Sequence, residues 1–195
     1  MIPFSPPHID EKIIAEVTEA LKSGWITTGP RTKQLEKNLT SYCGNKSTVC
    51  LNSATAGLEL VLRWFGVKEG DEVIIPSYTY CATANVVEHC GAKAVMVDVG
   101  KDFNISVEAI KNAITSKTKV IIAVDFSGFP CDYDEIYKVI EEKKSLFNAE
   151  TEEQKQLGRI LLLADAAHSI GATYKGRMSG SLADVSCFSF HAVKN

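Results

Sequence analysis

The residues best suited to chemistry are an amine and a carboxylate, each of which follows an apolar run. Lys194 comes after CFSFHAV, and Asp165 comes after RILLLA. A lysine in an apolar pocket loses proton affinity and becomes a usable nucleophile. A carboxylate at the end of a buried strand is unfavourable unless a cation or a hydrogen-bond donor meets it. The plainer alternatives are a solvated tail for Lys194 and a helix cap or salt bridge for Asp165.

The segment LNSATAGLEL could bind an anion. Its small residues Ser53, Ala54 and Thr55 lie between a predicted strand and a predicted helix, where hydroxyls and free backbone N–H groups come together. The chain has neither GxGxxG nor GxxxxGK[ST] here, so the segment is not a fingerprint for a dinucleotide or for ATP. Taken alone, Ser53 and Thr55 are more readily explained as a helix cap.

Two tyrosines follow another predicted strand, in PSYTYCATAN. Tyr78 or Tyr80 could stack on a flat cofactor ring, although ordinary packing is the commoner role. The run CFSFHAV, residues 187–193, reads as a further buried strand, and Ser189 and Lys194 flank its end. His168 alone is more typical of a structural histidine. Together these segments offer an anion site, an aromatic ring, a buried carboxylate and an amine. Those four parts are what the binding of pyridoxal phosphate requires.

The strands and helices that must position these side chains follow from the pattern of apolar residues. After two predicted helices, at 8–24 and 30–44, nearly continuous apolar runs alternate with amphipathic segments. Such runs are typical of parallel strands buried on both faces, with helices as the crossovers. We therefore predict an α/β fold, a three-layer α/β/α sandwich with a mostly parallel mixed sheet, whose ligands bind beyond the carboxyl ends of the strands. The predicted strands are 47–52, 71–76, 93–99, 118–126 and 158–167, and the helices between them are 55–66, 79–91, 106–114 and 132–155.

The composition argues against several classes of protein. The net charge is −3 and no lysine- or arginine-rich run stands out, which argues against a nucleic-acid surface. The longest apolar runs are too short to cross a bilayer, and the start MIPFSPPHIDEK lacks the pattern of a signal peptide, so we expect a cytoplasmic protein. The six cysteines form no CxxC pair and are expected to be reduced structural thiols rather than a metal site.

Segments in a fixed order along nearly the whole chain resemble the DegT/DnrJ/EryC1/StrS family of nucleotide-sugar aminotransferases, within the fold-type I enzymes that use pyridoxal phosphate. The resemblance implies the large domain of a transferase similar to aspartate aminotransferase. It assigns 1–29 to an N-terminal helix and substrate loop and 30–195 to an incomplete cofactor-binding domain, with the small C-terminal domain absent from this chain. The matching segments are LKSGWITTGPRTKQLEKNL, LNSATAGLEL, GDEVIIPSYTYCATANVV, GAKAVMVDV, AITSKTKVIIAVDFSGFPCD and ADAAHSIGATYKGRMSGSLADVSCFSFHAVKN.

The same resemblance implies a role for each matching residue. Lys194 corresponds to the lysine that forms the Schiff base with the cofactor, and Asp165 to the carboxylate that pairs with the pyridine nitrogen. Tyr80 corresponds to the aromatic residue that stacks on the ring, and His168 to a glutamine or histidine near the phenolic oxygen. The phosphate positions are Ala54, Thr55 and Ser189, and the loop bordering the substrate contains Trp25, Ile26 and Thr27. The family's usual Ser-Gly-Thr is Ser-Ala-Thr here, and backbone donation survives the added methyl group.

The implied reaction is transfer of an amino group, with glutamate as the usual donor, to a keto group of a nucleotide-linked deoxysugar in amino-sugar biosynthesis. Lys194 would carry a proton between the donor and the cofactor, while Asp165 keeps the ring nitrogen protonated. The resemblance also implies a homodimer, and from the composition we expect no nucleic-acid, membrane or metal partner.

Two other functions stay open. One is a dehydratase of the same family, in which histidine replaces the lysine; His191 lies close to Lys194 in the sequence. The other is a truncated, non-catalytic regulatory homologue. Relatives continue well beyond the lysine, so we expect this chain to be a fragment of a longer enzyme. The activity of the 195 residues alone is therefore in doubt.

Overall fold

The computed structural model describes residues 6–192 and residue 194. The chain divides into two compact units, which are considered separately below. The first unit comprises Met1–Cys50 and Phe190–Asn195, and the second comprises Leu51–Ser189. The domain boundary predicted between residues 29 and 30 stays a prediction.

The second unit is built on a five-stranded sheet in the order β2-β1-β3-β4-β7. Every pairing described within this sheet is parallel, so the carboxyl ends of the strands meet at one edge. In register, Asp165 is the last residue of β4 and pairs with Cys187, the last residue of β7. The strands are β1 (Glu72–Pro76), β2 (Lys93–Val97), β3 (Thr118–Val124), β4 (Leu161–Asp165) and β7 (Val185–Cys187).

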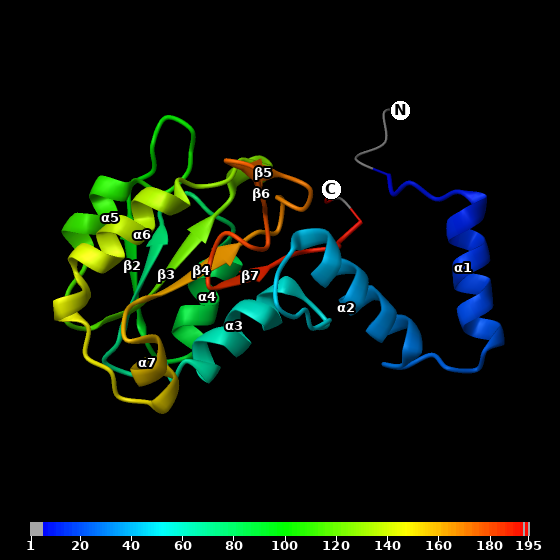
Figure 1. Ribbon diagram of the computed structural model, residues 1–195, viewed down its shortest axis with the longest axis horizontal. Helices are drawn as coiled ribbons and strands as arrows, with labels where there is room; N and C mark the ends of the chain where they lie inside the picture. Colours follow the sequence, from blue (N-terminus) through cyan, green and yellow to red (C-terminus); the bar gives the residue numbers. More distant parts are fainter. Residues whose placement is uncertain (1–5, 193, 195) are drawn as a thin grey trace. The chain divides into compact units, whose positions relative to one another are not determined.

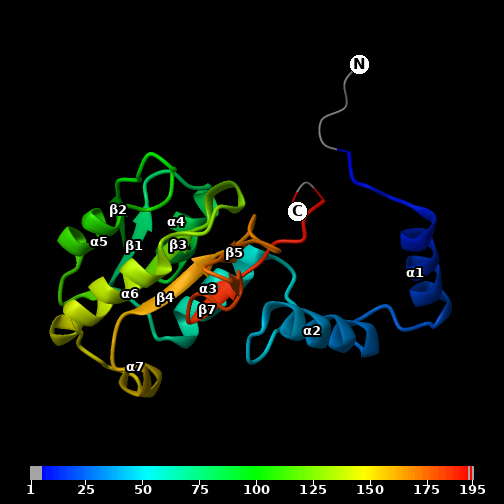
Figure 2. The same ribbon diagram turned by 45° about the horizontal axis from the view of Figure 1, so that its top comes forward.

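Helices cover both faces of this sheet, as Figures 1 and 2 show. The helices α3 (Ala54–Trp64) and α4 (Cys81–His89) pack on one face, and α5 (Val107–Ala113) and α6 (Tyr133–Glu142) pack on the other. Successive strand residues point to opposite faces. Val120 and Ile122 therefore join the core under α3 and α4, whereas Ile121 and Ala123 join the core under α5 and α6. Burial of each large aliphatic side chain stabilises the fold by about 1.5–3 kcal/mol. The predicted three-layer α/β architecture is confirmed.

Two predicted elements differ from the structure. Residues 47–52 do not form a strand, because the backbone N–H of Cys50 donates to the Glu36 carboxylate of α2 (Pro30–Cys43) at 3.0 Å. The predicted helix 132–155 breaks after α6, and a 3₁₀ turn at Lys144–Leu146 and a short helix, α7 (Glu152–Leu157), follow. Between them the buried Lys119 ammonium donates to the Asn148 carbonyl at 2.5 Å and to Glu150 at 3.2 Å. A buried ammonium needs such partners, which a continuous surface helix would not provide.

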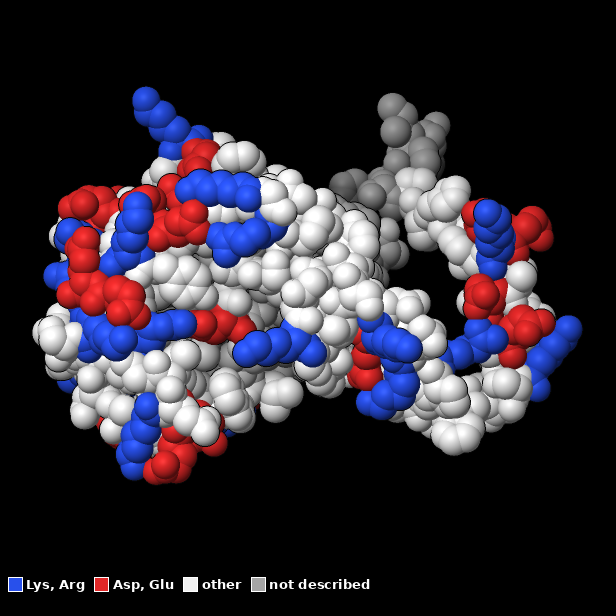
Figure 3. All heavy atoms as spheres, in the orientation of Figure 1, with Lys and Arg blue, Asp and Glu red and all other residues white. Residues whose placement is uncertain are grey.

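A small antiparallel hairpin, β5 (Thr173–Tyr174) with β6 (Arg177–Met178), lies between β4 and β7 in the sequence and was not predicted. Figure 3 shows acidic and basic side chains interspersed over the presented face of the second unit. Among the described residues, no helix combines the length and the apolarity needed to cross a membrane.

The first unit contains the two predicted helices, α1 (Glu11–Lys22) and α2. Asp10 begins α1 as its N-cap, because its carboxylate accepts the backbone N–H of Ile13 at 2.9 Å. The helix α1 carries an apolar face, but none of its residues is buried. That face consists of Ile13, Ile14, Val17 and Leu21, each more than a third exposed.

Candidate active site

Asp165 is a buried carboxylate at the carboxyl end of β4, where a parallel sheet binds its ligands. Its side chain accepts a hydrogen bond from the Thr83 hydroxyl, with Thr83 Oγ1 2.9 Å from Asp165 Oδ2. The backbone N–H of Ala167 lies 3.4 Å from Oδ1. Thr83 belongs to α4 and is fully buried, and its hydroxyl lies 2.8 Å from that of Thr79. The layer of helices above the sheet therefore holds this carboxylate from one side.

The backbone around Asp165 is fixed by its two neighbouring strands. The carbonyl of Asp165 accepts the N–H of Asp125, the residue after β3, at 3.2 Å. The N–H of Ala166 donates to the carbonyl of Cys187 at 3.0 Å. The carboxyl ends of β3, β4 and β7 are thus tied together, and Asp165 lies at the middle of the three.

Cys187 connects Asp165 to the first turn of α3. A methyl group added at Gly57 would lie 3.1 Å from Cys187 Sγ, so α3 approaches β7 closely at this glycine. Burial, and secondarily the Asp165 carboxylate, raise the pKa of the Cys187 thiol to about 12. The tight contact brings the beginning of α3 to the same edge of the sheet as Asp165.

The beginning of α3 is the predicted anion site. Ser53 caps the helix, because its hydroxyl accepts the N–H of Ala56 at 3.0 Å. Ala54 and Thr55 occupy the first turn and are half-buried. The N–H groups of a first helical turn have no acceptor within the helix and carry partial positive charge, so they suit a phosphate group. The serine is therefore a helix cap, and this role leaves the two following N–H groups available to a ligand.

The two predicted tyrosines have different surroundings. Tyr80 directly precedes α4, is 76% exposed, and accepts the backbone N–H of Thr83 on its carbonyl at 3.1 Å. Tyr80 therefore precedes the residue that holds Asp165 by one helical turn. Tyr78 packs in a cluster of three rings, with centroids 5.5 Å from Phe103 and 5.1 Å from Phe126. The prediction of one exposed ring for a ligand thus stays with Tyr80, while Tyr78 has a packing role.

His168 lies half-buried in the loop after β4, and a second buried carboxylate anchors that loop. Asp125 accepts the Ser169 hydroxyl at 2.7 Å, the Tyr133 hydroxyl at 2.8 Å and the backbone N–H of Cys131 at 3.0 Å. The Ser169 and Ser179 hydroxyls are also 2.7 Å apart. Burial raises the pKa of Asp125, against the effect of these donors. Asp125 was not predicted, although it follows an apolar strand in the same way as Asp165.

The remaining predicted residues are divided between the two units. Ser189 is half-buried and follows β7 in the second unit. Lys194 belongs to the first unit, where it is half-buried and its backbone N–H donates to the carbonyl of His191 at 2.8 Å. In the same unit the Trp25 indole donates to the Thr28 carbonyl at 3.1 Å. The predicted substrate residues Trp25 and Ile26 are exposed, as is Thr27.

The structure therefore brings Asp165 and the start of α3 to one edge of the second unit, with Tyr80 one turn from the threonine that holds the carboxylate. The residues that sequence reasoning missed are Thr83, Thr79 and Asp125. All six cysteines are free thiols, and Cys81 is the exposed one. Within the described part of the chain, no group of three histidine, cysteine, aspartate or glutamate side chains could hold a metal ion.

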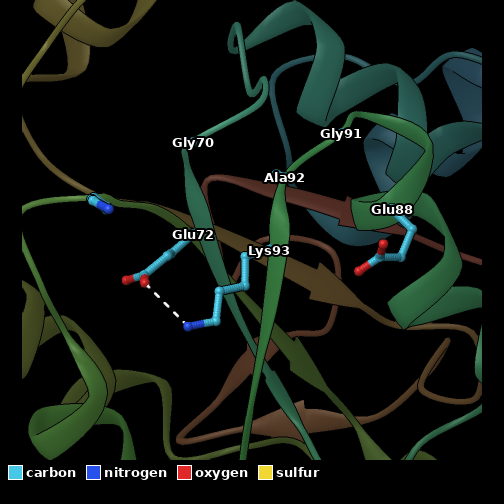
Figure 4. Close-up of a pocket in the computed structure, with 7 residues that line it drawn as sticks. Gly70, Glu72, Glu88, Gly91, Ala92 and Lys93 are labelled. Carbon is cyan, nitrogen blue, oxygen red and sulfur yellow. Dashed lines mark ion pairs between the residues drawn. The ribbon is translucent and has the colours of Figure 1, made fainter.

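A pocket in the second unit lies at the opposite edge of the sheet, near the amino-terminal ends of β1 and β2. Figure 4 shows Glu72 and Lys93, the first residues of these strands, paired across it with their charged atoms 3.7 Å apart. This pocket contains none of the predicted site residues. It is lined by Gly70, Glu72, Glu88, Gly91, Ala92, Lys93 and Lys117.

Comparison with known proteins gives a consistent picture. The model of the DegT/DnrJ/EryC1/StrS aminotransferase family matches residues 7–195. Spr1654 from Streptococcus pneumoniae, a proposed sugar aminotransferase solved in PLP, PMP and apo forms, is similar with 54% identity and a TM-score of 0.96. In its PMP form the match covers 99% of this chain and 49% of Spr1654.

Two further relatives are more distant. SpsC of Bacillus subtilis strain 168, a spore coat polysaccharide biosynthesis protein, is 39% identical over 195 residues, which are 100% of this chain and 46% of SpsC. PseC of Helicobacter pylori is an aminotransferase involved in the biosynthesis of pseudoaminic acid. It is 29% identical with a TM-score of 0.85, over 98% of this chain and 48% of PseC. The chain thus spans about half the length of the relatives it matches.

Proposed function

Because the chain belongs to the DegT/DnrJ/EryC1/StrS aminotransferase family, we propose that its protein binds pyridoxal phosphate and transfers an amino group to a keto group of a nucleotide-linked sugar. The membership confirms the resemblance found in the sequence. The observation that carries the proposal is the buried Asp165 carboxylate, hydrogen-bonded by Thr83 at the ligand-binding edge of the sheet. A buried carboxylate at that edge is what a protonated pyridine nitrogen needs as its partner.

The polar and aromatic groups of the second unit suit the parts of the cofactor. Pyridoxal phosphate, when bound, supplies a ring that accepts electrons from the reacting carbon. Asp165 keeps a proton on the nitrogen of that ring, because an adjacent anion favours the charged form. The N–H groups of Ala54 and Thr55, together with Ser189, donate to its phosphate. Tyr80 offers an exposed ring for stacking.

The other predicted residues complete the proposal. The Lys194 amine would hold the cofactor covalently through the aldehyde carbon, with loss of water. With the amino donor bound in its place, the Lys194 amine would act as the base that takes the proton of the donor's α-carbon and holds it on its own nitrogen. His168 binds the phenolic oxygen, and Trp25, Ile26 and Thr27 border the sugar. Lysine at 194, where the family's dehydratases carry histidine, favours amino transfer over dehydration.

The substrates and assembly are proposed on the same basis. The similarity to SpsC and PseC supports a sugar destined for a polysaccharide or for a related amino sugar. Glutamate as donor, a homodimer as the working form, and a cytoplasmic location stay predictions from the sequence.

The test is covalent attachment of the cofactor in the complete protein. After loading with pyridoxal phosphate and reduction with borohydride, mass spectrometry should locate the label on Lys194, and the visible absorbance of the cofactor should disappear in Lys194→Ala. The matched control is Lys37→Ala, which removes an exposed lysine of α2 and should keep both signals. Labelling that is unchanged in Lys194→Ala would disprove the assignment. Glutamate should then yield 2-oxoglutarate in the wild type, and its failure to do so would point to another amino donor.

A further inference from the structure

We propose that Thr83 is a positioning residue for Asp165, and that Thr79 orients Thr83 in turn. The inference rests on the proposed function, because the orientation of the Asp165 carboxylate matters for catalysis only where it meets the cofactor's ring nitrogen. Both threonines lie in the second unit with Asp165, so the three residues are described within one compact body. Their hydroxyls fix the rotation of the carboxylate and favour its ionised form.

The hydrogen bonds have a direction that follows from the donors available. An ionised carboxylate only accepts, and a hydroxyl has a single proton to donate. Thr83 therefore donates to Asp165 Oδ2, at 2.9 Å. Its proton is then used, so the contact of 2.8 Å between the two hydroxyls must be a donation from Thr79 to Thr83. The result is a relay of two hydroxyls that ends on the carboxylate.

The relay is rigid at its middle member. Thr83 is fully buried in α4, and a threonine in a helix is restricted to two main rotamers, so few directions are open to its hydroxyl. An aspartate carboxylate, in contrast, rotates over a broad range about its last torsion. The fixed hydroxyl therefore restrains the mobile carboxylate, rather than the reverse.

The relay also affects charge. Asp165 is buried, and burial disfavours the ionised form of a carboxylate. A hydrogen bond to the ionised form opposes this effect, and a donor that itself accepts a hydrogen bond is polarised into a stronger one. Thr83 thus supports both properties that the proposed function requires of Asp165, its negative charge and its orientation.

Three variants separate positioning from simple packing. Thr83→Val keeps the shape of the side chain and removes the hydroxyl, whereas Thr83→Ser keeps the hydroxyl and removes the methyl group. Thr79→Val removes the outer donor but leaves the Thr83 proton for Asp165. The matched control is Thr118→Val, because Thr118 is a fully buried threonine at the start of β3 whose hydroxyl accepts the N–H of Thr115 at 3.0 Å.

The first readout needs no cofactor. In the complete apoprotein labelled with ¹³C-aspartate, the carboxyl signal of Asp165 is identified by its absence from Asp165→Asn and then titrated with pH. Thr83→Val should shift the midpoint of this titration upward, because the ionised form loses a donor. Thr79→Val should shift it less, and Thr83→Ser and Thr118→Val should leave it close to the wild-type value.

The second readout uses the loaded protein. The affinity for pyridoxal phosphate and the rate of the half-reaction with glutamate should fall by about ten- to a hundredfold in Thr83→Val, since a hydrogen bond to a charged group is lost. The pH dependence of the cofactor's absorbance should change as well. Thr83→Ser should restore these properties.

Each outcome has a distinct meaning. Equal behaviour of Thr83→Val and the wild type in the titration, or damage in Thr83→Ser equal to that in Thr83→Val, would overturn the proposal. A shifted titration with an unchanged cofactor spectrum and affinity would also overturn it, because the hydroxyl would then hold Asp165 without bearing on the site. If the wild type binds no cofactor, the proposed function fails, whereas the titration of the apoprotein still decides whether Thr83 controls Asp165.

Discussion

The backbone N–H of Asp125 donates to the carbonyl of Asp165 at 3.2 Å, so two buried carboxylates end neighbouring strands of one sheet. Their side chains contact helices on opposite faces of the sheet. Asp165 meets Thr83 of α4, whereas Asp125 meets Tyr133 of α6. Asp165 is the carboxylate that we propose as the partner of the cofactor, and Asp125 holds the loop that carries His168.

Replacing Asp165 by asparagine keeps the shape of the side chain and removes its charge. We expect the rate of amino transfer by Asp165→Asn to fall by about 10²–10³-fold, because the proton on the ring nitrogen loses its anionic partner. Single-turnover kinetics with glutamate would measure this loss. Asp102→Asn, at an exposed position, should behave as the wild type. An Asp165→Asn variant with the wild-type rate would exclude a charged role for this residue.

The contact between Gly57 and Cys187 predicts that Gly57→Ala changes the free energy of unfolding in opposite directions in the wild type and in the Cys187→Ala variant. In Gly57→Ala the new methyl group would meet Cys187 Sγ at 3.1 Å, and overpacking of this kind destabilises by about 1–3 kcal/mol. Alanine in a helix is otherwise favoured over glycine by about 1 kcal/mol. The substitution should therefore lower the free energy of unfolding in the wild type and raise it in the Cys187→Ala background.

A urea-unfolding cycle over the four proteins would measure this coupling. Additive effects of the two substitutions would mean that α3 and β7 adjust without strain. The affinity for pyridoxal phosphate should fall in Gly57→Ala alone, since the predicted anion site is the turn that the methyl group displaces.

Removing one donor from Asp125 should destabilise the fold without removing a proposed catalytic group. Tyr133→Phe deletes the hydroxyl that lies 2.8 Å from the buried carboxylate and keeps the packing of the ring. A hydrogen bond to a charged group is worth about 1.5–3 kcal/mol, so the free energy of unfolding should fall by that amount. Tyr42→Phe, at an exposed tyrosine of α2, is the control. Equal stability of the two variants would show that Asp125 does not depend on Tyr133.

The pKa of Cys187 predicts a dependence of stability on alkaline pH. Burial first, and then the Asp165 carboxylate, raise the pKa of this thiol from 9.0 to about 12. A group whose pKa is raised on folding contributes its full stability below the unfolded value and loses it as the pH rises toward the folded value. Unfolding free energies should therefore decline between pH 9 and 12, and Cys187→Ala should flatten this decline. Cys81→Ala, at the exposed thiol, should leave it unchanged.

Most of the sheet was predictable, because β1, β3 and β4 are continuous apolar runs whose burial leaves few alternatives. The predictions were wrong at two places. At Cys50 the backbone N–H donates to the Glu36 side chain instead of to a neighbouring strand, and near Glu150 the chain leaves the helix to provide partners for the buried Lys119. Neither contact is visible in a local pattern of hydrophobicity.

The residues of the candidate site were likewise predictable only in part. The burial of Asp165 at the end of a strand was predictable from the apolar run before it, and its role toward the cofactor stays a prediction. Thr83 was not predictable, because its partner lies 82 residues away in the sequence and only the packing of α4 on the sheet brings the two together. Asp125 carried the same local signal as Asp165, and only the fold distinguishes the carboxylate that faces α4 from the one that faces α6.

The strand order β2-β1-β3-β4-β7 has a consequence for synthesis on the ribosome. After the first pair forms, each later strand joins an edge that already exists, so the sheet can grow in the order in which the chain emerges and no strand must be inserted between two others. Asp165 therefore lies on an open sheet edge until β7 is translated and Cys187 pairs with it. The carboxylate proposed for catalysis gains its second neighbouring strand only when β7 joins the sheet.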